Sequence, residues 1–370
     1  MEIASYPIRR LRARLVEGID APLFALALSL AAIGLAALYS ASYENASRVA
    51  GQLGNLALAL TAMWAVAQVA PQTLARFALP AYAAGIALLV AVALFGEVVN
   101  GARRWLQLDL VRFQPSEMMK IAVPMMLAWY FHRREGSIRL RDFALAGLLL
   151  AVPVALVARQ PDLGTALLIA AAGFYVIFFA GIGWKLLAGL AVLGLVALMP
   201  LWGMLHDYQR RRILTLLDPT TDPLGAGYHI IQSTIAVGSG GIAGKGWLNG
   251  SQTHLEFIPE RHTDFIFAVY SEEFGLIGNM VLLSLYALLI ARGLAIAAGA
   301  PTPFARLLAG AVTMIFFTYA FVNMGMVAGL LPVVGVPLPF ISYGGTALMT
   351  LFVGIGILMS IHRHRKLVQT

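Results

Sequence analysis

The chain has 370 residues, of which 60% are hydrophobic and only 12% are charged. A soluble globular protein of this length does not carry so large an apolar share, so the composition favours an integral membrane protein. The net charge of +8 does not predict nucleic-acid binding, because the basic residues lie in short loops and tails, a pattern typical of membrane orientation. The absence of cysteine excludes disulfides and thiolate metal sites.

Apolar segments long enough to cross a bilayer recur along the whole chain, and no polar stretch is long enough for a separate soluble domain. We therefore predict an all-α fold, a single polytopic membrane domain over residues 1–370 with about ten transmembrane helices. The predicted spans are residues 21–41, 51–70, 74–95, 115–132, 143–158, 163–181, 185–205, 264–292, 304–329 and 340–362.

Basic residues predict the orientation. They cluster before the first span, between the fourth and fifth, and after the last: Arg9, Arg10, Arg12 and Arg14; Arg133, Arg134, Arg139 and Arg141; Arg363, Arg365 and Lys366. With ten crossings all three clusters fall on one side, which the positive-inside rule makes cytoplasmic. Both termini are then predicted inside. Residues 96–114 and the large loop 206–263 between the seventh and eighth spans are predicted outside.

These two loops carry cations on the side where few are expected: Arg103, Arg104, Arg112, Arg210, Arg211, Arg212, Lys245 and Arg261. Ion pairing within the loops is one interpretation, since acids are present too. As a group, cations beside a membrane favour an anionic substrate such as a lipid phosphate.

A glycine-rich run at 238–246 superficially resembles a phosphate-binding loop. It lacks the Walker spacing and the strand–helix context, so the sequence does not predict a nucleotide site. We expect a flexible or re-entrant loop that lies against lipid.

Ionised groups at membrane depth are costly, and several occur in or at the ends of the predicted spans. They are Glu117 and Lys120, which share a helix face at i and i+3, Asp162, Glu272 and Glu273, together with the polar Asn323. All lie in the outer half of the membrane on the predicted topology. A transporter should instead show polar groups near the midplane. The pattern therefore favours an enzyme that opens to the outer leaflet.

Structural roles remain as alternatives for these residues. Glu117 and Lys120 can form a buried pair that holds helices together. Asp162 can cap a helix, and Glu272 and Glu273 can cap a helix or pair with loop arginines.

The segment 255–275 carries the strongest functional signal. Glu260, Arg261, His262 and Asp264 crowd a loop that runs directly into a long apolar helix. Asp264 would stand where water, hydrocarbon and a lipid headgroup meet, a setting that tunes a carboxylate for acid–base chemistry. Helix capping is the alternative for Asp264. No His/Asp/Glu spacing here is typical of a zinc site.

Five motifs resemble those of the SEDS family of shape, elongation, division and sporulation proteins. They are GARRW (101–105), RFQPSE (112–117) with Lys120, QPDLGTA (160–166), PERHTDFIFAV (259–269) and LPVVGVPLPFISYGG (331–345). The match covers nearly the whole chain in order, and residues 258–264 and 332–335 resemble the elongation branch more than the division branch. One departure is Tyr270-Ser271, where smaller or more apolar residues are usual.

The resemblance implies a peptidoglycan glycosyltransferase of the bacterial cytoplasmic membrane that polymerises lipid II during cell elongation. The acceptor's 4-hydroxyl would attack the donor's anomeric carbon with inversion, and Asp264 corresponds to the family's catalytic aspartate. An alcohol nucleophile needs such a base, and a leaving pyrophosphate needs cations. The candidate pyrophosphate ligands are Arg103, Arg104, Arg112, Lys120, Arg210 and Arg261. The residues expected to shape the site are Glu117, Asp162, Glu260, His262, Glu272, Glu273 and Asn323.

The resemblance also implies help from Mg²⁺ or Mn²⁺, although the sequence shows no defined metal motif. No nucleotide, haem or zinc cofactor is predicted. The expected partners are lipid II, a class B penicillin-binding protein that acts as transpeptidase, the elongation machinery and membrane lipids, and no nucleic acid.

Two other functions remain. A lipid II flippase is disfavoured because the polar residues are confined to the outer half. A non-enzymatic scaffold for a transpeptidase would not require buried acids at the outer mouth.

Overall fold

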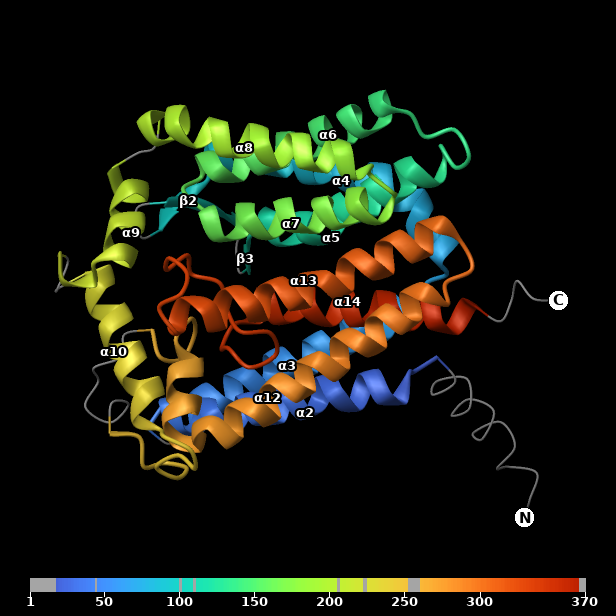
Figure 1. Ribbon diagram of the computed structural model, residues 1–370. Helices are drawn as coiled ribbons and strands as arrows, with labels where there is room; N and C mark the ends of the chain where they lie inside the picture. Colours follow the sequence, from blue (N-terminus) through green and yellow to red (C-terminus); the bar gives the residue numbers. More distant parts are fainter. Residues whose placement is uncertain are drawn as a thin grey trace, which may run out of the picture.

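The computed structural model describes residues 18–43, 45–99, 102–108, 111–204, 207–221, 225–251 and 260–365. Long helices run back and forth side by side in one bundle (Figure 1). They are α2 (Ala21–Ala41), α3 (Ala46–Ala67), α4 (Pro71–Phe95), α5 (Pro115–His132), α6 (Leu140–Arg159), α7 (Leu163–Phe179), α8 (Trp184–Met204), α12 (Ile266–Ala298), α13 (Pro303–Val327) and α14 (Gly345–His364).

The shorter elements gather at one end of this bundle, on the left in Figure 1. They are strands β1 (Glu97–Val99), β2 (Ala102–Leu108) and β3 (Val111–Phe113), and helices α9 (Asp207–Leu217), η1 (Pro219–Thr221) and α10 (Ala226–Ser239). We call this end the loop end. Helix α2 begins and α14 ends at the opposite end, which we call the terminal end (Figure 1).

The predicted all-α polytopic membrane fold is confirmed. Seven helices of the described chain are long and apolar enough to cross a membrane, namely α2, α3, α4, α6, α12, α13 and α14. Helix α7 and the apolar part of α8 are shorter, and α5 carries Glu117 and Lys120 within 18 residues. That these three helices cross the membrane remains a prediction. Their position alongside the other helices supports it (Figure 1).

Helix boundaries follow local chemistry. The bounds of α2 and α5 coincide with the prediction, and both helices have proline at the first or second position, where a missing N–H costs nothing. The last predicted span, 340–362, begins too early, since α14 starts at Gly345. Three prolines precede that helix, at positions 332, 337 and 339, and they favour the extended loop that the structure shows there.

A small antiparallel sheet in the order β1-β2-β3 lies within the loop 96–114 and was not predicted. Two of its strands have only three residues, too few to show an alternating pattern in the sequence.

Helix α12 is broken near the loop end, at Gly275 (φ 61°, ψ −157°). The glycine-rich run 238–246 supplies the backbone bonds that this break leaves open, a role the sequence analysis did not predict. Its expected place against lipid stays a prediction. The amides of Lys245 and Gly246 donate to the carbonyls of Glu272 and Glu273 at 3.0 and 2.9 Å, and that of Leu276 donates to the Gly241 carbonyl at 2.9 Å.

The glycines of this run are needed for the close approach. A Cβ at Gly240 would lie 2.1 Å from the Ser271 carbonyl, and one at Gly244 would lie 2.1 Å from that of Glu273. The run is thus a backbone brace for α12 rather than a phosphate loop.

Helix α13 lies at the centre of the bundle, where it packs against α5, α7, α12 and α14. Most of its side chains are buried, including the polar Thr313, Tyr319 and Asn323. A buried polar side chain must find a hydrogen-bond partner, so α13 is where polar contacts between helices are expected.

The topology predicts different access for two single cysteines in this cysteine-free chain. Thr220→Cys, exposed in η1 at the loop end, should react with an impermeant thiol reagent on intact spheroplasts. Ser137→Cys, exposed between α5 and α6 at the terminal end, should react only after lysis. The reverse pattern would overturn the predicted orientation.

Candidate active site

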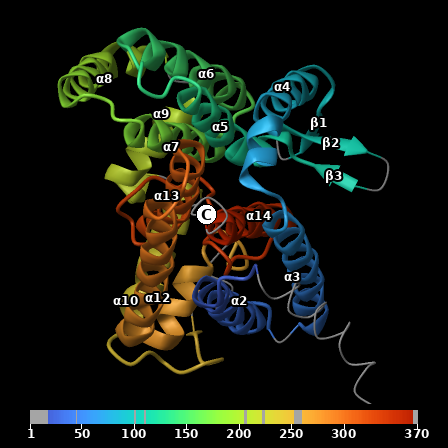
Figure 2. The same ribbon diagram turned by 90° about the vertical axis from the view of Figure 1, so that its right-hand side faces the viewer.

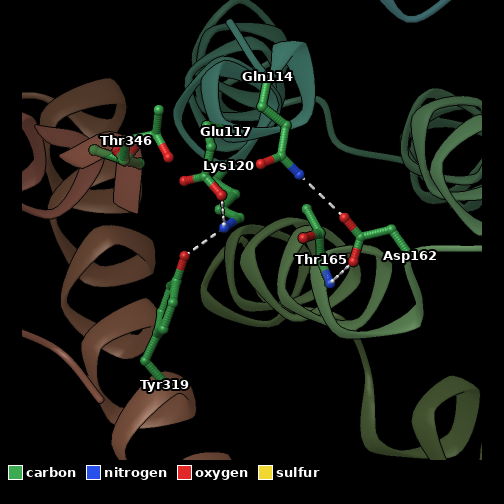
Figure 3. A network of polar contacts seen from close by, with 8 residues as sticks. Gln114, Glu117, Lys120, Asp162, Thr165, Tyr319 and Thr346 are labelled. Carbon is green, nitrogen blue, oxygen red and sulfur yellow. Dashed lines mark hydrogen bonds and ion pairs between the residues drawn. The ribbon is translucent and has the colours of Figure 1, made fainter. Parts of the chain in front are cut away.

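Polar side chains from three helices meet inside the bundle near the loop end (Figure 3). Lys120 Nζ lies 2.5 Å from Glu117 Oε1 and donates to Tyr319 Oη at the same distance. All three residues are buried, and Glu117 Oε2 has no hydrogen-bond partner among the described residues. Thr346 of α14 faces Glu117 from the other side (Figure 3). The predicted i, i+3 pair therefore exists, with a tyrosine that the sequence analysis missed.

Asp162 lies beside this cluster at the start of α7. Its Oδ1 accepts a bond from the Thr165 amide at 3.1 Å, which caps the helix, and its Oδ2 accepts one from Gln114 Nε2 at 3.1 Å. Asp162 therefore is a helix cap, the alternative left open for it, and also joins α7 to α5 (Figure 3). The Arg104 guanidinium donates to the carbonyls of Gln160 and Pro161, which directly precede Asp162.

Asp264 lies in a turn just before α12, which begins at Ile266. It does not cap that helix: the N-cap position belongs to Phe265, and no side-chain cap bond is present. The carboxylate receives no hydrogen bond from the described residues, and its Oδ2 would lie 3.3 Å from a Cβ placed on Gly335. Burial, together with the charge of Glu260, raises the pKa of Asp264 to about 6.

The turn is held by Asn323 from α13. Its Nδ2 donates to the main-chain oxygens of Asp264 and Val336, both at 2.7 Å. Asn323 lies four residues after Tyr319, so the two side chains share a face of α13, about 6 Å apart along its axis. One turn of α13 thus connects the Lys120 cluster with the Asp264 turn.

Two further residues fasten this turn to the α2–α3 hairpin. Arg261 Nε donates to the Ala41 carbonyl at 2.9 Å, and its guanidinium carbon lies 4.3 Å from the ring centre of Tyr43. His262 contacts Arg48 of α3. Burial, with the nearby Arg48 and Arg261 charges, lowers the pKa of His262 to about 4, so the imidazole is neutral at pH 7.

Glu272 and Glu273 lie in the first part of α12, before the break at Gly275. Glu272 is fully buried and pairs with Lys245 at 2.6 Å, and Ser40 of α2 donates to Glu273. Lys245 belongs to the loop 206–263. Glu272 therefore pairs with a loop cation, as its structural alternative predicted, but the cation is a lysine and not an arginine. Both acids hold α12 to its neighbours.

The structure does not bring Arg210 to these clusters. Its guanidinium donates to the carbonyls of Trp202 and Gly203, at 3.0 and 2.8 Å, near the end of α8. These last carbonyls of a helix have no partner within it, and the arginine satisfies them. The side chains of Arg103 and Arg112 lie outside the described residues, so their predicted role stays a prediction.

An apolar groove of about 470 Å³ begins beside Glu117 and lies between α3, α4, α5 and α14. Its wall on α5 extends from Gln114 to Met125, about 16 Å along the helix. The exposed Leu58 of α3, with 62% of its surface accessible, shows that the groove reaches the outside of the bundle. Residues 342–346 join the groove to the Asp264 turn, because Ser342 Oγ donates to the Thr263 carbonyl at 2.6 Å and Thr346 lines the groove.

No three His, Asp or Glu side chains of the described chain come together to hold a metal ion. Asp264 and Glu260 are nevertheless close enough for one charge to raise the pKa of the other carboxyl. Mg²⁺ commonly takes one or two carboxylates and completes its shell with water and substrate phosphates. Glu260 fits such an ion when a phosphate-bearing substrate supplies the remaining ligands, which leaves Asp264 free to act as a base.

The fold and the site define a polytopic membrane protein whose buried acids lie beside an apolar groove. A family model described as cell cycle protein, FtsW/RodA/SpoVE, matches residues 20–367. The chain is 52% identical to the peptidoglycan glycosyltransferase MrdB of Escherichia coli K12, over 95% of each chain. It is 36% identical to the probable peptidoglycan glycosyltransferase FtsW of Geobacter metallireducens, over 96% of this chain and 98% of that protein.

Two solved structures are similar along nearly the whole chain. A chain from work on "structural coordination of polymerization and crosslinking by a peptidoglycan synthase complex" has a TM-score of 0.82 at 37% identity, over 95% of this chain and 99% of that one. The rod shape determining protein RodA of Thermus thermophilus has a TM-score of 0.71 at 31% identity, over 94% and 97%.

The chain belongs to the FtsW/RodA/SpoVE family of cell cycle proteins. The resemblance inferred from the five motifs and the predicted class, a peptidoglycan glycosyltransferase, are confirmed. The chain is also a multi-pass membrane protein, as predicted.

Three residues of the site were missed by sequence reasoning: Gln114, Tyr319 and Arg48. A signal existed for Tyr319, since it precedes Asn323 by four residues in an otherwise apolar helix and shares its face. Gln114 stands in a matched motif directly before α5. Arg48 contacts a residue 214 positions away, and no local pattern encodes such a contact.

Glu117→Ala and Lys120→Ala should each destabilise the protein in detergent, because each strands a buried charge. Breaking a well-buried pair costs on the order of 3–5 kcal/mol, which should appear as a lower melting temperature. Lys185→Ala, which removes an exposed lysine of α8, is the matched control and should melt like the wild type. Single variants that melt normally but lose activity would give the pair a chemical role instead.

Proposed function

We propose that this chain polymerises lipid II at the loop end, with Asp264 as the general base and the loop end facing the outer leaflet. The observation that carries the proposal is the Asp264 carboxylate. It lies in a turn outside the helix, accepts no hydrogen bond from the described residues and has a pKa raised to about 6. A general base works best when its pKa lies near the operating pH.

The reaction needs one proton acceptor and one leaving group. The 4-hydroxyl of the acceptor sugar attacks the anomeric carbon of the donor and loses its proton to Asp264. The bond from that carbon to the pyrophosphate oxygen breaks, and its electron pair leaves with undecaprenyl pyrophosphate. A single displacement inverts the anomeric carbon and needs no covalent enzyme intermediate.

The apolar groove beside Glu117 supports a lipid substrate. It offers about 470 Å³ lined by methionine, leucine, isoleucine and valine side chains, which suits part of a prenyl chain. The polar cluster stands at its mouth, where the headgroup of a bound lipid would lie. Arg104, beside Asp162, and Lys120 are the described predicted cations that lie at this cluster.

A divalent cation remains part of the proposal. Glu260, together with substrate phosphates, would hold Mg²⁺ or Mn²⁺ beside Asp264. Such an ion would stabilise negative charge on the leaving pyrophosphate.

We also propose a class B penicillin-binding protein as the partner that cross-links the strands. The described chain has no domain outside the membrane bundle that could act on peptides. A similar chain comes from a complex in which polymerization and crosslinking are coordinated. Failure to copurify with such a transpeptidase would count against this partner.

The flippase alternative has less support. The described buried acids near the loop end have no counterpart at the bundle midplane, where a transporter binds its cargo. At the terminal end, Asp20 and Asp142 pair with Arg292 and Arg134.

Asp264→Asn should abolish polymerisation of lipid II by the purified protein. Asparagine keeps the size but cannot take the acceptor's proton, so the rate should fall by roughly 10²-fold or more while the fold is kept. Asp142→Asn, at a buried aspartate of the terminal end, is the matched control, and the folded variant should retain activity. Glycan synthesis by Asp264→Asn near the wild-type rate would exclude the base assignment.

A further inference from the structure

A second cavity lies far from the Asp264 turn, at the terminal end. It has a volume of about 490 Å³ and is bounded by the first part of α4 and the last turn of α5. Three basic residues line it: Arg76, His132 and Arg133. In Figure 2 the terminal end faces the viewer, and both helices reach it. None of these residues belongs to the polymerisation site.

The arginines of this cavity are not neutralised within the described chain. No ion pair joins Arg76 or Arg133 to an acid there, and His132 Nδ1 lies 3.9 Å from Glu135 Oε2, too far for a hydrogen bond. Both arginines are exposed. Two guanidinium groups and an imidazole around one cavity without a bonded acid make a site for an anion.

Apolar groups on the same cavity place it at a membrane interface. Trp129 lines it, and the guanidinium carbon of Arg133 lies 4.7 Å from the centre of the Trp129 ring. Tryptophan is enriched at the headgroup level of membranes. Leu79, with 49% of its surface accessible, and Pro80 continue the cavity wall along α4 toward the bundle midplane. An anion with an attached acyl chain fits both parts of this wall.

We propose that this cavity binds the headgroup of an anionic glycerophospholipid, with its phosphate between Arg76 and Arg133 and an acyl chain along Leu79 and Pro80. The site faces the inner leaflet if the terminal end is cytoplasmic, as predicted. Basic pockets between helices on the cytoplasmic side bind such headgroups. The site does not depend on the polymerisation chemistry.

Native mass spectrometry of the purified protein, titrated with phosphatidylglycerol, tests the proposal. Arg76→Gln and Arg133→Gln should each weaken binding about fivefold, and the double variant by about 25-fold, from the loss of one charge contact each. Phosphatidylcholine binding should not change. Inorganic phosphate at millimolar concentration should not compete, because the acyl chain contributes to binding.

The matched control is Arg141→Gln, an exposed arginine on the same side that does not line the cavity. It should change phosphatidylglycerol binding by less than about twofold. All variants should still polymerise lipid II, which separates this test from that of the proposed function. If Arg141→Gln weakened phosphatidylglycerol binding as much as the cavity variants do, the binding would come from general surface charge and not from this site, and the proposal would fail. Full competition by phosphate, or unchanged binding by the double variant, would also overturn the proposal.

Discussion

Two hydrogen bonds from one buried amide organise the candidate active site. Asn323 Nδ2 donates to the main-chain oxygens of Asp264 and Val336, and so ties the turn before α12 to the loop before α14. The bond to Val336 is buried and the bond to Asp264 is partly buried, so the loss of either would leave a polar group short of a partner away from bulk water. On the same face of α13, Tyr319 receives the Lys120 bond. Helix α13 therefore sets the position of the proposed base, Asp264, and of the ion pair together.

The break in α12 is the second condition for this arrangement. A continuous helix would extend through residues 271–277 with all its backbone bonds internal, whereas the break at Gly275 leaves amides and carbonyls that the glycine-rich run satisfies. Lys245 then pairs with the buried Glu272. The first turns of α12, and Asp264 just before them, are thus held by the large loop as well as by α13. We infer that this loop is part of the active-site architecture.

The sequence predicted what local patterns encode. Apolar runs located the ten long helices, and most of the helix ends were predicted to within a few residues. The i, i+3 spacing predicted the Glu117–Lys120 pair. The crowded loop before α12 singled out Asp264. The contact between Arg48 and His262, 214 positions apart, was beyond this reasoning. The local contact of Arg210 with the end of α8 was also not predicted. The role of the glycine run as a brace for α12 was not predicted, because its partner is a break in another helix, which the sequence of the run does not encode.

The acid limb of the pH–rate profile for lipid II polymerisation tests the central claim, that a carboxylate with raised pKa takes the acceptor's proton. Since Asp264 must be ionised, the wild-type rate should be level above pH 7 and fall tenfold per unit below about pH 6. Glu260→Gln removes a repelling charge, lowers the pKa of Asp264 and should move this limb to lower pH. A limb near pH 4 in the wild type, or one that Glu260→Gln leaves in place, would contradict the account.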